Sequence, residues 1–327
     1  MTLRSSLLAV LALFSLSIIR AQDLTGYGYL ESPVSARGLA LGGTSLSVVE
    51  PEMSLAEQNP ALLCPQMAGQ AVLSYINYMA GIQMGYAAYS GTFMEVGGWS
   101  AGMRFVDYGH FDGYDVQGLS TGSFSVKDMC LEGAIGYPLN ERWNVGAQAK
   151  FLYTSYESYN AFALGFDLGL NYYNEVSGNS FSMTVTNLGG QLKPLYEDRR
   201  QKLPTQVNLG WSRELQHLPI CISVTAYHLL DWHEGYVNGN GEKQTYSGAD
   251  QVLNHLIFGI EWTAYKNFWL ATSYNYRHQR QFSGQGGFLR GLAFGAGLIY
   301  HSFNFQVGYA SSHLADGTLA FQLGYTF

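Results

Sequence analysis

The feature that most constrains the fold is an alternation of apolar with small or polar residues, which recurs from residue 69 to the C-terminus. Runs of roughly ten residues keep this period of two and are separated by glycine, asparagine and aspartate turn signals. A period of two places successive side chains on opposite faces, so each run predicts a strand with one apolar face. Fourteen runs occur, at 69–78, 81–90, 97–106, 126–139, 142–155, 161–173, 180–188, 204–215, 219–230, 253–265, 267–278, 291–302, 303–312 and 318–327.

The length of each connection depends on whether it follows an even-numbered or an odd-numbered run. After even-numbered runs they are mostly short, as at 140–141, 266–267 and 302–303. After several odd-numbered runs they are long, at 107–125, 189–203, 231–252 and 279–290. Even strand numbers, short periplasmic turns and long outer loops are typical of outer-membrane barrels. The sequence therefore predicts an all-β fold, a fourteen-stranded antiparallel transmembrane β-barrel in the outer membrane in contact with lipid. A secreted β-sandwich or propeller is the alternative.

Charged residues fall on the polar side of the alternating runs. In the run 161–173, Phe166 and Leu168 share the apolar side, and Asp167 lies between them on the other. A charge facing lipid at the bilayer midplane costs about 2–4 kcal/mol, so the polar side should face the lumen. The predicted lumen network consists of Arg104, Asp128, Glu132, Lys150, Asp167, Glu261 and Arg277.

The chain divides into three parts. Residues 1–21 have a basic start, an apolar stretch of roughly 15 residues and a small residue before the cut, as in a secretory signal peptide. Residues 22–68 lack the period of two and predict a plug inside the barrel or a strap beneath it. Residues 69–327 form the barrel. Its last strand should close against the first, with Tyr325 and Phe327 at the periplasmic interface.

Composition excludes several classes of function. The formal net charge of -7 argues against a nucleic-acid partner. No stretch reaches about 18 consecutive apolar residues, so helical membrane spans are excluded. The eight histidines and three cysteines have no recognised ligand spacing, and no serine can be paired with a base from the sequence. We therefore expect no metal, no cofactor, no catalytic residues and no enzymatic activity, with an outer-membrane hydrolase as the remaining enzymatic alternative.

Two motifs before the barrel carry a resemblance to a known superfamily. "SARGLALGG" at 35–43 and "NPALL" at 59–63 are similar to the N-terminal signature of FadL-like outer-membrane barrels. This resemblance implies a barrel of fourteen strands and a hatch that contains the Asn-Pro-Ala turn. The C-terminal Tyr325 and Phe327 resemble the signal by which the outer-membrane assembly machinery recognises barrels.

Within that superfamily the chain resembles the PorQ family of the Bacteroidetes type IX secretion system. The similar motifs are "PVSARGLALGG" (33–43), "QNPALL" (58–63), "LSYINY" (73–78), "DYGHFDGYD" (107–115), "TNLGGQLKPLY" (186–196) and "LLDWH" (229–233). The resemblance implies an outer-membrane subunit of the complex that attaches secreted cargo to the cell surface. It also implies a surface partner like PorZ, alongside the sortase-like PorU and the barrel PorV. In "LLDWH", His233 stands where the family pattern has an acidic residue.

Two functions from different classes follow. In the first, the barrel anchors a protein partner through its outer loops, where Trp232, Tyr236 and Tyr246 are of the residue types favoured at interfaces. In the second, it transports hydrophobic small molecules, as FadL-like transporters do. An apolar substrate would have to desolvate the charged lumen side chains, so the sequence favours the anchor.

Overall fold

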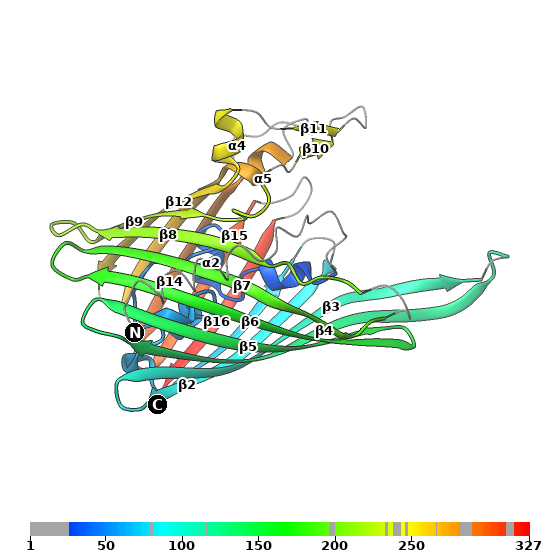
Figure 1. Ribbon diagram of the computed structural model, residues 1–327, viewed down its shortest axis with the longest axis horizontal. Helices are drawn as coiled ribbons and strands as arrows, with labels where there is room; N and C mark the ends of the chain where they lie inside the picture. The colour runs from blue at the N-terminus through cyan, green and yellow to red at the C-terminus, as the bar shows by residue number, and fades with distance from the viewer. Residues whose placement is uncertain are drawn as a thin grey trace, which may run out of the picture.

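The protein is a single closed barrel (Figure 1). The computed structural model describes residues 26–327 except 79–80, 116, 196–199, 233–234, 238–242, 246–247, 266, 282–289 and 312–316. Its strands run in the order β1-β16-β15-β14-β13-β12-β9-β8-β7-β6-β5-β4-β3-β2, and every neighbouring pair is antiparallel. The predicted fourteen-stranded antiparallel barrel is confirmed. The expected signal peptide, 1–21, lies outside the described residues.

Each alternating run of the sequence overlaps one barrel strand. The barrel strands are β1 (Gln70–Asn77), β2 (Gln83–Phe93), β3 (Gly97–Tyr114), β4 (Ser120–Pro138), β5 (Trp143–Tyr156), β6 (Tyr159–Asn174), β7 (Asn179–Lys193), β8 (Gln206–Glu214), β9 (Ile220–Ala226), β12 (Leu256–Tyr265), β13 (Phe268–Asn275), β14 (Leu292–Tyr300), β15 (Phe303–Ala310) and β16 (Thr318–Thr326). A small hairpin of β10 (Gly235–Val237) and β11 (Lys243–Thr245) lies between β9 and β12.

The helices are short. They are η1 (Gly28–Glu31), α2 (Ala36–Ala40), α3 (Met53–Ala56), η2 (Pro60–Leu62), η3 (Pro65–Met67), α4 (Ala249–Leu253) and α5 (Tyr276–Gln281). Among the described residues, no helix is long and apolar enough to cross a membrane.

The barrel closes where the first strand meets the last. β1 pairs with β16 from Gln70↔Thr326 to Asn77↔Leu319. The backbone N–H of Phe327 then donates to the carbonyl of Gly69, at 3.0 Å, so pairing continues to the final residue. Closure leaves no free edge along the wall, which satisfies the backbone groups that lipid cannot.

Side chains alternate between the two faces of the wall as the sequence predicted. On β6, Phe166 and Leu168 are exposed on the outside, whereas Asp167 between them is buried inside. On β4, Leu131 is exposed and Glu132 is buried. An apolar outer face and a polar inner face are what a barrel in lipid requires.

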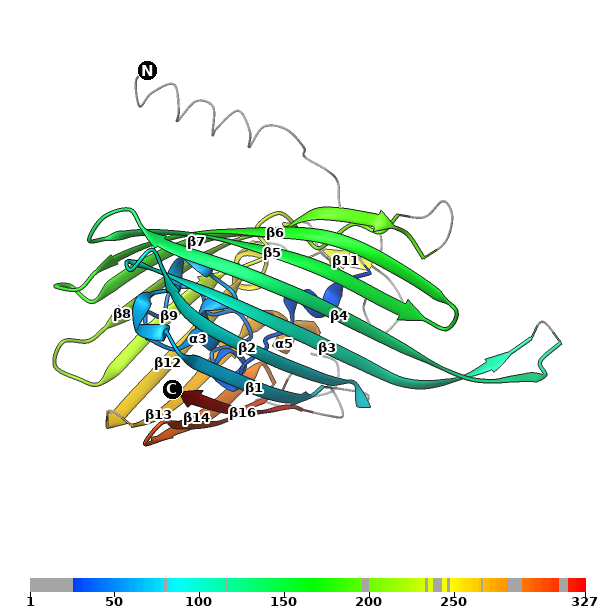
Figure 2. The same ribbon diagram turned by 90° about the horizontal axis from the view of Figure 1, so that it is seen from below.

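The structure corrects one predicted loop. Residues 107–125 were expected to be an outer loop, yet β3 and β4 stay paired as far as Tyr114↔Ser120. The hairpin extends well past the rest of the barrel wall (Figures 1 and 2). Gly109 and Gly122, which have φ values of 85° and 104°, sit at or beside irregularities of the ladder. These glycines therefore act as bulge residues and not as a loop.

Residues 26–68 lie inside the barrel (Figure 2). Helix α2 contacts β13, β14, β15 and β16, and η2 contacts β4, β5 and β6 on the other side of the lumen. Tyr27, Ala36 and Leu39 of this segment share an apolar core with Val106 and Leu152 of the wall. Of the plug and the strap expected for residues 22–68, the described part has the position of a plug. We refer to residues 26–68 as the plug.

Candidate functional site

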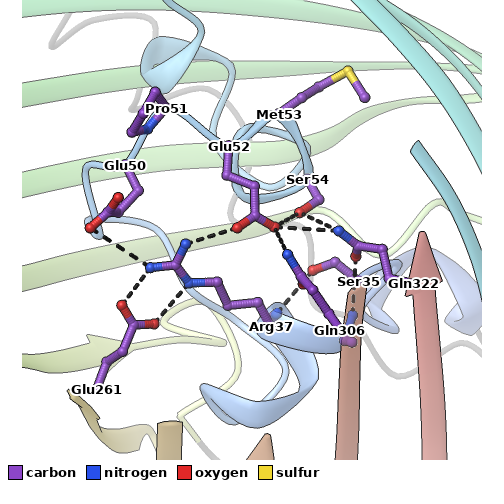
Figure 3. A network of polar contacts seen from close by, with 12 residues as sticks. Ser35, Arg37, Glu50, Pro51, Glu52, Met53, Ser54, Glu261, Gln306 and Gln322 are labelled. Atoms are coloured by element: carbon purple, nitrogen blue, oxygen red, sulfur yellow. Dashed lines mark hydrogen bonds and ion pairs between the residues drawn. The ribbon is translucent and has the colours of Figure 1, made fainter. Parts of the chain in front are cut away.

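Arg37 of α2 links the plug to the barrel wall. Its Nε donates to Oε2 of Glu261 on β12 at 2.8 Å, and its Nη2 donates to the other oxygen of the same carboxylate (Figure 3). The guanidinium also lies over the ring of Trp269 on β13, 5.2 Å from its centroid. Arg37 and Glu261 are both almost fully buried. A two-point contact of this kind fixes the orientation of both groups as well as their distance.

The third nitrogen of the Arg37 guanidinium, Nη1, binds another residue of the plug. Nη1 donates to Oε2 of Glu52 at 2.8 Å, and Oε1 of Glu52 accepts from Nε2 of Gln306 on β15 at 2.7 Å. Gln322 on β16 donates to the same oxygen at 3.3 Å and accepts from the backbone N–H of Ala36 at 3.3 Å (Figure 3). One buried network therefore ties α2 and the loop before α3 to three strands.

A second buried pair lies on the opposite side of the lumen. Arg104 of β3 donates through Nη2 to Glu57 of the plug, and through Nη1 to the carbonyls of Tyr29 at 3.0 Å and Ser32 at 3.2 Å. Arg104 is 1% exposed. Removing water from a guanidinium is costly, and these plug acceptors replace that water.

A third pair belongs to the wall alone. Nζ of Lys150 on β5 lies 2.6 Å from Oδ2 of Asp167 on β6 and donates to Oδ1 of Asn187 at 3.1 Å. The other oxygen of Asp167 accepts from the backbone N–H of Asn187 at 2.7 Å. Asn187 has a φ of 57°, a conformation that asparagine tolerates better than most residues. These three residues cross-link β5, β6 and β7 inside the barrel.

The plug turn at residues 59–64 packs against a row of glycines in the wall. Gly98, Gly136, Gly146 and Gly169 lie on β3, β4, β5 and β6 and are paired with one another in register. A Cβ placed at Gly146 would lie 2.2 Å from the carbonyl carbon of Pro60, and one at Gly169 would lie 2.2 Å from Oδ1 of Asn59. No larger side chain fits between this turn and these strands without movement of the backbone.

Asn59 gives the turn its shape. Its Oδ1 accepts from the backbone N–H of Ala61 at 3.1 Å, which caps η2, and Pro60 occupies the first position of that helix. Its Nδ2 donates to the carbonyl of Leu46 at 2.8 Å. The Asn-Pro-Ala turn thus lies in the lumen, where the superfamily resemblance placed it. Asparagine caps and proline at the first helical position are both favoured in local sequence terms.

Six of the seven predicted lumen residues are buried inside the barrel: Arg104, Asp128, Glu132, Lys150, Asp167 and Glu261. Asp128 accepts from Thr154 at 2.5 Å and from Tyr108 at 2.7 Å. Glu132 interacts with the buried hydroxyl of Tyr86 on β2. Arg277 differs, because β13 ends at Asn275 and Arg277 lies in α5, beyond the strand.

A cavity of about 300 Å³ with a mixed polar and apolar lining lies at the outer end of the lumen above the plug. Lys150, Asn187 and Asn208 line it from the wall, and Arg277 and His228 line it from the outer connections. Burial, and then the nearby Arg277, lower the pKa of His228 to about 3, so this imidazole is neutral at neutral pH. Apolar side chains such as Leu39, Leu46 and Leu292 line the rest of the cavity, so its surface is mixed.

The predicted partner-binding aromatics are described only in part. Trp232 is 39% exposed, and its ring lies 4.6 Å from that of His255. Tyr236 belongs to β10. Tyr246 lies outside the described residues. The structure therefore places Trp232 and the backbone of Tyr236 in one outer connection, between β9 and β12.

The C-terminal aromatics form a cluster at the end of the barrel seam. Tyr325 packs edge-on against Phe327, with ring centroids 4.8 Å apart, and against Phe303 at 4.9 Å. Phe327 is 81% exposed on the outer face. This cluster lies on the side of the short turns, where an interfacial aromatic belt is expected.

The described part of the chain holds no group of three His, Cys, Asp or Glu side chains placed to bind a metal ion. The site that the structure does build is a plug fixed in a polar lumen. Sequence reasoning missed Arg37, Glu52 and Glu57, which are the plug partners of the predicted wall residues. It also missed the glycine row, although each of the four runs concerned carries a glycine close to a short turn.

Fold and site together define a plugged outer-membrane barrel. A scan of protein-family profiles finds no match, and no curated protein matches in sequence. Solved structures do match. The toluene transporter TbuX of Ralstonia pickettii is similar with a TM-score of 0.54 at 14% identity, covering 91% of this chain and 99% of that one.

Two further structures share the architecture. The toluene transporter TodX of Pseudomonas putida has a TM-score of 0.52 at 12% identity, covering 90% of this chain and 98% of its own. The monoaromatic hydrocarbon channel CymD has a TM-score of 0.51 at 12% identity, with coverages of 90% and 97%. At such identities the likeness shows the fold alone, which this chain shares with these two transporters and the channel.

Proposed function

We propose that this protein is a non-catalytic outer-membrane anchor of a type IX secretion and attachment machinery, holding a surface protein at its outer loops. The proposal combines the resemblance to the PorQ family with the geometry of the lumen. The resemblance supplies the partner class, a surface protein like PorZ, with PorU and PorV in the same complex.

The observation that carries the proposal is the fixed plug. Arg37, Glu52 and Glu261 form one buried network, and Arg104 with Glu57 forms a second one across the lumen. Removing one partner from a buried pair costs about 3–5 kcal/mol, so a plug movement that separates both pairs is strongly opposed. An anchor needs only a stable, closed barrel, and this arrangement supplies one.

Transport of hydrophobic small molecules is the second candidate. It is favoured by the fold, because the similar solved structures are named as toluene transporters and a hydrocarbon channel. It is disfavoured by the charged and amide groups in the cavity lining, such as Lys150, Asn187 and Arg277, because an apolar substrate makes no hydrogen bonds with them.

The test compares partner retention with uptake. The full-length barrel is extracted from membranes in mild detergent, and associated surface proteins are identified by mass. The variant Trp232→Ser/Tyr236→Ser/Tyr246→Ser should release the partner, because interface aromatics each carry about 2 kcal/mol or more. Leu230→Ser, at a neighbouring exposed position, is the matched control.

The same cells are assayed for uptake of a long-chain hydrophobic tracer. The anchor predicts unchanged uptake in a strain that lacks the protein. Loss of uptake in that strain, together with full partner retention by the triple variant, would favour the transporter and contradict the anchor.

A further inference from the structure

The β3–β4 hairpin reverses the side on which strand β4 is apolar. Within the barrel, the outer side of β4 carries Leu131 and Met129, and the inner side carries the buried Glu132 and Asp128. Towards the hairpin tip the outer side carries Ser125 and Ser123, while the inner side carries Val126 and Phe124. An outer face that turns polar has left the lipid. The reversal therefore marks the point where the hairpin rises from the membrane.

Strand β3 follows the same reversal. Phe111 pairs with Phe124, and His110 pairs with Ser125, so Phe111 continues the lumen side and His110 the outer side. The rings of Phe111 and Phe124 stack with centroids 5.7 Å apart, and Phe124 lies 5.3 Å from Tyr156 of β5. We refer to Phe111, Phe124 and Tyr156 as the inner aromatic face of the hairpin.

This face is open within the described part of the chain. Phe111 is 44% exposed, and Tyr114 and Leu119 near the tip are 65% exposed each. β2 stops pairing with β3 at Asp107, and β5 stops pairing with β4 at Val126. Among the described residues, neither edge of the hairpin has a neighbouring strand beyond these positions. An aromatic face on a free-standing ribbon, on the side of the barrel mouth, is an unusual exposure of apolar surface.

The charge of the hairpin limits which kinds of partner can bind to the inner aromatic face. Asp107 at the base of the hairpin pairs with Lys127, and beyond this pair the hairpin carries Asp112 and Asp115 and no lysine, arginine or glutamate. An anionic membrane surface repels such a segment, because juxtamembrane attraction to anionic lipid requires basic residues. A second copy of the same hairpin is repelled for the same reason. A protein surface with an apolar patch bordered by basic side chains is complementary.

We propose that the inner aromatic face of the β3–β4 hairpin is a docking surface for a folded surface protein that sits over the barrel mouth and presents an apolar patch with a basic border. This inference rests on the proposed anchor function and names the element that holds the partner. It assigns to the hairpin a share of the binding that the sequence placed in residues 231–251. Phe111 and Phe124 supply rigid apolar contact, and Asp112 on the opposite face contributes to the acidic field.

The test uses the full-length protein in living cells, with the photo-reactive residue p-benzoylphenylalanine as the probe. It is placed at Phe111 or Phe124 on the inner face, and at Ser123 or Ser125 on the outer face as matched controls. We expect the inner positions, and not the outer ones, to cross-link to a separate surface polypeptide. Phe111→Ser/Phe124→Ser should lower partner retention at least tenfold, and Ser123→Ala/Ser125→Ala should leave it unchanged.

Every other outcome overturns the inference. Equal cross-linking from both faces would show no docking face, and cross-links within the same chain would show that its own loops cover the aromatics. Cross-links to a second copy or to lipopolysaccharide would identify a different occupant. If the partner stays bound to the unmodified barrel while the inner positions remain unlinked, the inference fails and the anchor function stands. If no surface protein accompanies the unmodified barrel, the anchor function itself fails.

Discussion

The two sides of the lumen hold the plug in different ways. On the side of β12–β16, the plug is held by side chains, through Arg37, Glu52 and their carboxylate and amide partners, and α2 also lies against the paired glycines Gly295 and Gly308. On the side of β3–β6, apart from the Arg104 pair, the plug backbone lies directly against glycines. The first side therefore combines charged and amide contacts with close packing on glycines, whereas the second depends mainly on the absence of wall side chains. The charged contacts fix the orientation of α2 in the lumen, whereas the glycine row lets the turn at residues 59–64 pack closely against the wall.

The largest effect is expected on the charged side. Arg37→Met keeps the side-chain volume but leaves Glu261 and Glu52 buried without their cation, so the barrel should lose about 3–5 kcal/mol of unfolding free energy. Urea titration of the purified barrel in detergent measures the loss. Arg213→Met, at an exposed arginine on β8, is the control and should change stability by less than about 0.5 kcal/mol.

A double variant sharpens this result. Arg37→Met/Glu261→Leu removes both charges of the wall contact, and it should recover part of the loss because no uncompensated pair remains there. If Arg37→Met were as mild as the Arg213 control, the network would not be what holds this side of the plug.

A slightly smaller effect is expected on the glycine side. Gly146→Val adds atoms where a Cβ would already lie 2.2 Å from the plug backbone, so the turn must move, at a cost of about 3 kcal/mol. Protease cleavage within residues 26–68 of the folded barrel measures the displacement. Gly133→Val is the matched control, since a Cβ at Gly133 meets only the carbonyl of Ser100, at 4.0 Å. Equal protection of the plug in both variants would contradict the role of the glycine row.

The smallest effect on stability is expected at Phe327, the exposed ring at the end of the seam. Phe327→Asp should change the unfolding free energy by less than about 1 kcal/mol, because the ring is 81% exposed. The amount of heat-modifiable barrel in the outer membrane should nevertheless fall, as the resemblance to an assembly signal implies. If the variant showed normal amounts of heat-modifiable barrel, Phe327 would have no role in assembly and would be only part of the aromatic cluster.

The wall could be predicted from sequence because its rule is local. A period of two identifies a strand wherever it occurs, and one polar residue in such a run is enough to predict its face, as for Asp167 and Glu132. The same rule failed at residues 107–125, because Gly109 and Gly122 are turn signals in sequence and bulge residues in the structure. Local composition does not distinguish these two uses of glycine.

The plug contacts could not be predicted, because they join distant positions. Glu261 was predicted to face the lumen, but nothing in its neighbourhood indicates that its partner is Arg37. The glycine row, in contrast, could have been predicted from the sequence. Once the short turns fix the register of β3–β6, Gly98, Gly136, Gly146 and Gly169 fall on one line.

The plug contacts also bear on the order in which parts of the protein fold. Arg37 and Glu261 are 224 residues apart, and Ala36 and Gln322 are 286 apart. The turn at Asn59 needs β3–β6 side by side, whereas α2 needs strands that are made last. Because these contacts join positions so far apart in the chain, we expect them to be among the slowest to form when the barrel folds. Until β12–β16 have paired, the guanidinium of Arg37 is solvated by water.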